Sequence, residues 1–141
     1  MGWVVDTSVL LDIRVGHPVH GTASAECLQR HASAGLVVCP ITLIEMAPAF
    51  RGDLASERAW LEGLGITTRE AWLTEDTEAA HRLWHEAIER KRQGLAPRRP
   101  VADVLIAAFA LRFDGLITRN ETDFRTIAPQ LALVVPTPIA S

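Results

Sequence analysis

Residues 100–111 read PVADVLIAAFAL, and this stretch decides how the rest of the chain is interpreted. Ten of its twelve residues are apolar and compatible with a helix, and the proline suits a first helical turn. A helix that is apolar on all sides is a buried helix. The one acid, Asp103, therefore needs a partner, because burying a bare carboxylate is very costly. Taken alone it is most simply a helix-capping residue, and the sharper alternative is that it binds a metal ion with carboxylates distant in sequence.

The composition is that of one soluble globular domain spanning residues 1–141. The chain is 48% hydrophobic and 22% charged, and it is long enough to bury a core. It has no run of eighteen apolar residues and no secretory signal, so we expect a cytoplasmic protein without a membrane span. Cys27 and Cys39 form no close pair, which favours two reduced, buried thiols over a disulfide or a zinc site.

Charge and motifs exclude two classes of protein. The net charge of −3 is wrong for a general nucleic-acid binder. No Gly-Lys-Ser/Thr motif is present, so the chain is not a P-loop protein. His81 and His85 lie one helical turn apart without a third ligand, and a solvated helix face is the favoured interpretation. The tryptophans are most simply packing residues, although Trp60 and Trp84 could border a groove for a partner helix.

Short apolar runs alternate with helical patterns along the whole chain. Strands are expected at residues 2–6, 36–39, 116–118 and 131–135, with an ambiguous segment at 66–73. Helices are expected at residues 7–13, 19–34, 41–47, 54–64, 75–93 and 100–111, a basic loop at 95–99 and a polar loop at 119–127. Continuous rather than alternating apolar strands are typical of a parallel sheet covered on both faces, so the fold class is α/β.

Four acids occupy corresponding positions in this pattern. Asp6 ends the first strand, Glu45 lies in the apolar helix after the second, and Asp103 opens the helix before the fourth; Asp123 lies in the loop beyond that strand. In a parallel sheet, sites form outside the carboxyl ends of the strands, where the strand order reverses. Asp6 and Asp123 suit that edge, and the helices with Glu45 and Asp103 would turn their first turns towards it.

Four carboxylates in one place repel each other, and without a cation several would bind protons. Mg²⁺ or Mn²⁺ would neutralise them, because hard cations prefer oxygen ligands. The chemistry that fits is metal-assisted hydrolysis of a phosphodiester. Each acid also has a structural interpretation: Asp6 as a helix cap, Asp123 as a solvated loop residue. Glu45 has the weakest one, because glutamate is rarely buried without a partner.

The chain resembles a PIN-domain endoribonuclease, specifically a VapC-type toxin of a type II toxin–antitoxin module. The matching segments are VVDTSVLL at 4–11, ITLIEM at 41–46, VADVLIAA at 101–108 and LITRNETDF at 116–124. Each is weak alone, but the four occur in the family's order over nearly the whole chain. The resemblance implies a PIN-like three-layer sandwich around a mostly parallel five-stranded sheet. It also implies Mg²⁺-dependent cleavage of RNA, with Mn²⁺ as a possible substitute.

The resemblance also implies roles for particular residues. Asp6, Glu45, Asp103 and Asp123 are expected as catalytic metal ligands, and Ser8, Thr118 and Asn120 as supporting residues. Many family members carry an aspartate where this chain has Asn120, which leaves open whether one metal ion is bound or two. Arg98, Arg99 and Arg119 are the candidates to receive RNA phosphates. Expected partners are the RNA, a cognate antitoxin that blocks the acidic site, and a second copy in a homodimer.

Other functions fit part of the pattern. A metal-dependent phosphatase or a nuclease with a non-RNA substrate would use the same carboxylates. A catalytically weak or inactive PIN domain could serve as a binding module, which Asn120 keeps open. A phosphoacceptor receiver fits poorly, since it would want an acidic pair after the first strand and a late lysine, and Lys91 is the last lysine.

Overall fold

The computed structural model describes residues 1–94 and 101–138. Its elements are β1 (Trp3–Val5), α1 (Thr7–Val15), α2 (Gly21–His31), η1 (Ala32–Ala34), β2 (Leu36–Val37), α3 (Pro40–Glu45), η2 (Ala47–Phe50), α4 (Leu54–Gly63), β3 (Ile66–Thr67), α5 (Thr74–Arg92), α6 (Val101–Ala110), β4 (Gly115–Ile117), α7 (Glu121–Ile127) and β5 (Leu133–Val134). The expected α/β class is confirmed, and residues 66–67 of the ambiguous segment form a strand.

The strands form one parallel sheet in the order β3-β2-β1-β4-β5. The chain fills one half of the sheet outward from β1 to β3 and then returns to the other side of β1 for β4 and β5. The strand order therefore reverses between β1 and β4. The crevice outside the carboxyl ends of two such strands is the usual ligand site of an open α/β sheet.

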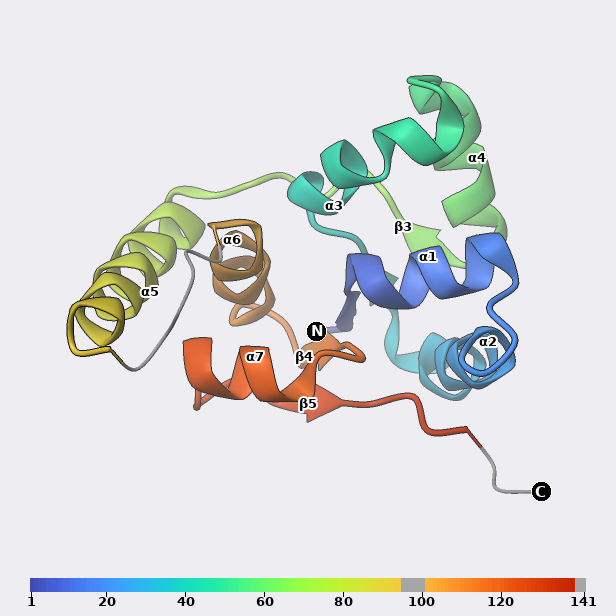
Figure 1. Ribbon diagram of the computed structural model, residues 1–141. Helices are drawn as coiled ribbons and strands as arrows, with labels where there is room; N and C mark the ends of the chain where they lie inside the picture. The colour runs from blue at the N-terminus through green and yellow to red at the C-terminus, as the bar shows by residue number, and fades with distance from the viewer. Residues whose placement is uncertain (95–100, 139–141) are drawn as a thin grey trace.

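Helices cover both faces of this sheet (Figure 1). Val4 of β1 belongs to a core shared with α5, α6 and α7, whereas Val5 belongs to a second core shared with α1, α2 and α4. Neighbouring residues of a strand point to opposite faces. Both faces are buried, which explains why the strands read as continuous apolar runs rather than alternating ones.

Local sequence signals set several boundaries. The side chain of Asp6 caps α1, and Gly16 ends that helix in the left-handed conformation at φ 65°. Pro40 occupies the first turn of α3, and the carboxylate of Asp53 caps α4 by accepting a hydrogen bond from the backbone N–H of Ser56 at 3.1 Å. Cys27 and Cys39 are both buried and free, as expected.

The expected polar loop at 119–127 is wrong except for its first two residues, because residues 121–127 form α7. The helix buries Phe124 and Ile127, which are three residues apart and therefore on one face. The expected helix at 19–34 also ends early, at His31, and continues as a single 3₁₀ turn. Among the described residues, no helix combines the length and apolar character needed to cross a membrane.

Candidate active site

Asp6 lies at the centre of the crevice between β1 and β4. It directly follows β1, and its backbone N–H donates to the carbonyl of Ile117 at the end of β4 at 2.9 Å. The residue is only 2% exposed. The strand pairing therefore brings Asp6 and Thr118, 112 residues apart in sequence, to the same edge of the sheet.

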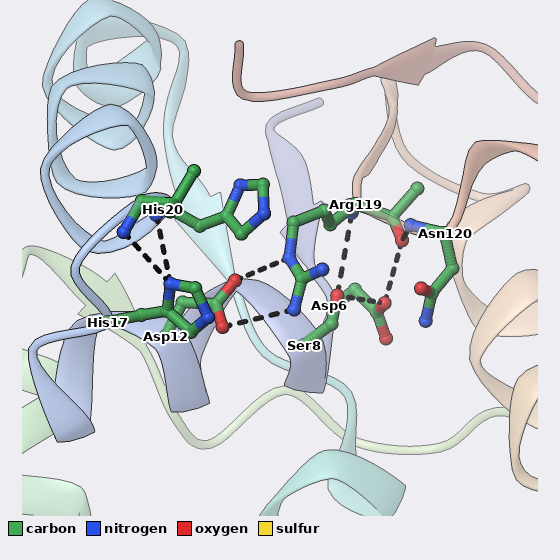
Figure 2. Close-up of polar contacts among 9 residues, drawn as sticks. Asp6, Ser8, Asp12, His17, His20, Arg119 and Asn120 are labelled. Atoms are coloured by element: carbon green, nitrogen blue, oxygen red, sulfur yellow. Dashed lines mark hydrogen bonds and ion pairs between the residues drawn. The ribbon is translucent and has the colours of Figure 1, made fainter. Parts of the chain in front are cut away.

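Three donors hold the Asp6 carboxylate. Oδ1 accepts the backbone N–H of Thr7 at 2.8 Å, the contact of a helix cap. Oδ2 accepts the hydroxyl of Ser8 at 2.8 Å and that of Thr118 at 2.7 Å. Figure 2 shows Asp6 and Ser8 side by side next to the segment after β4. Asp6 thus caps α1, as the structural interpretation expects, and the same buried carboxylate lies at the switch point.

The balance of forces on Asp6 favours a nearby cation. Burial raises the pKa of the Asp6 carboxyl, and hydrogen bonds from Thr118, Ser8 and Thr7 oppose that rise. The negative charge of Glu45 raises the pKa further, and the net direction is upward. An ionised Asp6 therefore lacks full compensation from its surroundings, and a positive ion at this edge would supply it.

Glu45 reaches the same edge through Thr7. The hydroxyl of Thr7 donates to Oε1 of Glu45 at 2.6 Å and lies 3.0 Å from Oγ1 of Thr42. The expectation of a buried Glu45 is wrong, because the side chain is exposed at the end of α3. The apolar neighbours that suggested burial belong to a short helix whose other surface, including Ile44 at 69% exposure, faces outward.

Asp103 lies in the first turn of α6 and is half-buried. Helix α6 packs against α3, which carries Glu45, so the two acids come from adjacent helices. The helix is buried along its second half, as its composition indicated, although Val101 at its start is 51% exposed. Pro100, expected in its first turn, lies outside the described residues.

Asp123 lies on the short helix that follows β4. It is exposed in the first turn of α7 and lines a hollow of about 370 Å³ together with Arg119, Asn120 and Val135. Asn120 is exposed as well, and its backbone N–H donates to the hydroxyl of Thr118 at 3.0 Å. No contact joins Asp123 to Asp6, although the segment from Thr118 to Asn120 connects their surroundings.

The four acids do not form one closed ligand set. Within residues 1–94 and 101–138, no three histidine, cysteine or acidic side chains lie close enough together to hold a metal ion. Mg²⁺, however, is usually held by only one or two carboxylates and keeps several waters. Asp6 and Glu45, with the hydroxyls of Ser8 and Thr7, form an all-oxygen donor set of that kind. The residues present fit a hard cation that keeps several waters rather than one held entirely by protein ligands.

Arg119 is engaged in an ion pair that the sequence did not indicate. Its Nε and Nη2 donate to the two carboxylate oxygens of Asp12 at 2.6 and 3.1 Å (Figure 2). Asp12 is 5% exposed on α1. An acid in an apolar helical pattern was the signal that singled out Asp103, and the same signal applies to Asp12. Arg98 and Arg99 lie outside the described residues.

The fold and this edge define a class: a parallel α/β domain with an acidic crevice at its topological switch point. The chain belongs to the PIN domain family, whose pattern matches residues 3–129. Among curated proteins, no sequence matches this chain. The structure is similar to a chain in the complex VapBC2 from Rickettsia felis bound to a DNA fragment from their promoter, with a TM-score of 0.70 and 19% identity. The match covers 96% of this chain and 98% of that one, and at this identity it establishes the fold.

Proposed function

We propose that this chain is a Mg²⁺-dependent endoribonuclease and the toxin of a toxin–antitoxin pair. The observation that carries the proposal is the buried carboxylate of Asp6 at the switch point, held by the hydroxyls of Ser8 and Thr118. Membership of the PIN domain family supports it, as does a fold shared with a chain of a VapBC2 complex.

The acids divide into roles by their positions. Asp6 and Glu45 would hold the metal ion directly, and Asp103 directly or through water. Asp123 would supply the fourth carboxylate from the first turn of α7. When bound, the ion would supply an activated water and stabilise charge on the phosphate. The hydroxyls of Ser8 and Thr118 occupy both lone-pair sites of Oδ2 of Asp6, and the backbone N–H of Thr7 occupies one site of Oδ1, so the second site of Oδ1 would accept the cation. Because Asn120 is neutral, we propose one strong metal site rather than two.

The proposed partners are the RNA, an antitoxin and a second copy of the chain. Arg98 and Arg99 are the proposed contacts to RNA phosphates, because Arg119 is already paired with Asp12. A cognate antitoxin would cover the acidic crevice, and a second copy of the chain would complete a homodimer. Mn²⁺ would replace Mg²⁺, since both prefer oxygen ligands.

The test is cleavage of a broad pool of single-stranded RNA in Mg²⁺, in Mn²⁺ and in chelator. Asp6→Asn and Asp103→Asn, purified identically, exclude a contaminating ribonuclease. Asp53→Asn is the matched control, because Asp53 is an exposed cap of α4 away from the crevice and asparagine also caps helices. We expect metal-dependent cleavage by the parent and the control and none by the other two. Equal cleavage by all four would refute the proposal; cleavage by none would favour an inactive binding module.

A further inference from the structure

An apolar groove lies between α5, α6 and α3, beyond the residues used so far. Its volume is about 510 Å³, within the usual range for a small-molecule site. The walls include Trp72, Trp84, Ile41 and Leu105, and among the described residues His81 is the one titratable residue that lines it. Figure 1 shows α5 and α6 lying together on one side of the sheet. We propose that this groove binds an unpaired nucleobase of the RNA, an inference that rests on the proposed function.

The aromatic wall of the groove is fixed in place. The indole of Trp72 stacks on the buried ring of Phe109, with centroids 6.2 Å apart and planes 16° from parallel. Its N–H donates to the hydroxyl of Thr77 at 2.8 Å, so its polar group needs no further partner. Because Phe109 covers the core side of this indole, the opposite face is the one that borders the groove. A rigid, satisfied aromatic ring is the kind of surface on which bases stack.

Helix α5 supplies the second half of the wall. Thr77, Ala80, His81 and Trp84 recur at helical spacing, so they lie along one face of α5. Trp84 is half-buried in this face, and His81 is exposed beside it. A base stacked on the indole would also find a hydrogen-bonding imidazole next to it.

The groove is lined by the two helices, α3 and α6, that carry Glu45 and Asp103. Ile41 lies four residues before Glu45 on α3, which is one turn and about 6 Å along a helix axis. Leu105 lies two residues after Asp103 on α6. A nucleotide strand with a phosphate at the acids would therefore carry the adjacent base towards the indoles.

The chemistry of the walls selects the base rather than the phosphate. Apart from His81, the part of the lining that the structure describes is uncharged. An anionic phosphate gains nothing from such a surface, whereas a neutral base gains by stacking on each indole it meets. Stacking requires an unpaired base, so the inferred substrate is single-stranded RNA or a loop.

Binding in chelator tests the inference without cleavage. The probes are a fluorescently labelled eight-nucleotide oligouridylate and an abasic ribose-phosphate oligomer of equal length, measured by fluorescence anisotropy. The parent should prefer the base-bearing oligomer. Trp84→Ala should weaken its binding about tenfold, the scale of one stacked base, and reduce the preference over the abasic oligomer by the same factor, because Trp72 remains. Trp84→Phe, which keeps a ring, should stay within about threefold of the parent.

Control variants separate stacking from general effects. Trp60→Ala removes a tryptophan of the other core and should keep the base preference. His81→Ala should weaken binding, whereas His85→Ala, exposed one turn further along α5 and outside the groove, should not.

Three results would overturn the inference: no binding of RNA by the parent, equal binding of both oligomers by the parent, or a base preference that is undiminished in Trp84→Ala. A fourth result would also overturn it: Trp84→Ala converts a dimer to a monomer while the RNA affinity per chain stays unchanged. The groove would then be a contact surface between two copies of the chain. A Trp84-dependent base preference without metal-dependent cleavage would instead refute the proposed function and leave the groove as a base site.

Discussion

The guanidinium of Arg119 and the carboxylate of Asp12 form a two-point ion pair between residues 107 positions apart, with N–O distances of 2.6 and 3.1 Å. The backbone N–H of Arg119 also lies 3.4 Å from the hydroxyl of Ser8, which donates to Asp6. The ion pair therefore joins α1 to the segment that delivers Thr118 to the crevice. Arg119 therefore holds the segment after β4 against α1, next to Asp6.

The two halves of this ion pair should not be equally costly to remove. Asp12 has 7% of its side chain exposed and Arg119 has 34%. Arg119→Met leaves a buried charge without its partner, and we expect it to lower the free energy of unfolding by about 3 kcal/mol. Asp12→Asn leaves a guanidinium that water can reach, and about 1 kcal/mol is expected. Urea denaturation measures both, and an equal or reversed order would contradict this assignment.

A second buried ion pair fixes the start of α5. Both oxygens of Asp76 accept from Arg112, at 3.0 and 2.9 Å, and Asp76 also accepts the backbone N–H of Leu73 at 2.9 Å. The guanidinium lies 4.9 and 4.8 Å from the ring centroids of Phe109 and Phe113. Lysine can reproduce neither the two-point geometry nor the stacking.

Arg112→Lys should therefore lower the free energy of unfolding by about 2 kcal/mol, most of the cost of breaking a buried pair. The matched control is Arg125→Lys, because Arg125 pairs with Glu121 on the surface and has 61% of its side chain exposed. A surface pair of this kind should change stability by less than about 0.5 kcal/mol. Denaturant titration measures the free energy of unfolding of both variants. Similar losses of stability would show that the burial of Asp76 does not make its ion pair stronger than the surface pair.

Glu57 provides a pH-dependent prediction. The residue is 1% exposed, and its Oε2 has no hydrogen-bond partner among the residues that the structure describes. Burial raises the pKa of its carboxyl above the ordinary 4.5, with Arg58 opposing. The folded protein therefore binds this proton more tightly than the unfolded chain does. Ionised Glu57 costs stability at neutral pH, and the cost disappears as the pH falls through the raised pKa and below 4.5.

Glu57→Gln should accordingly stabilise the fold at pH 7, because the amide carries no charge that burial would penalise. The difference from the parent should shrink towards zero in acid. Thermal unfolding of both proteins across the pH range measures it. A variant that is less stable at pH 7, or a difference that is constant with pH, would rule out an uncompensated carboxylate at this position.

The sequence predicted the sheet well because its strands are buried on both faces. Val4 and Val5 enter different cores, so no polar residue interrupts the run. It also placed Asp6 at the edge where strand order reverses. It could not provide that strand order, because pairing of β1 with β4 depends on contacts between residues more than 100 positions apart.

The misses have local causes. Polar residues between Arg119 and Ile127 hid a short helix that buries little besides Phe124 and Ile127. Apolar neighbours made Glu45 look buried, although one surface of α3 faces outward. The sequence did not predict the ion pair of Asp12 with Arg119, because the two residues are 107 positions apart and Arg119 was expected to contact RNA. Local patterns indicated which side chains were unusual, and only the tertiary structure paired them.

Thermal unfolding of the parent and of Asp6→Asn, in chelator and in Mg²⁺, tests most directly whether the crevice around Asp6 binds a divalent cation. Asparagine keeps the helix cap and removes the ionised group. In chelator, the variant should be at least as stable as the parent. Saturating Mg²⁺ should raise the Tm of the parent by several degrees and leave the variant unchanged. Equal shifts in both proteins, or a variant that is much less stable in both conditions, would show that Asp6 is only a structural cap.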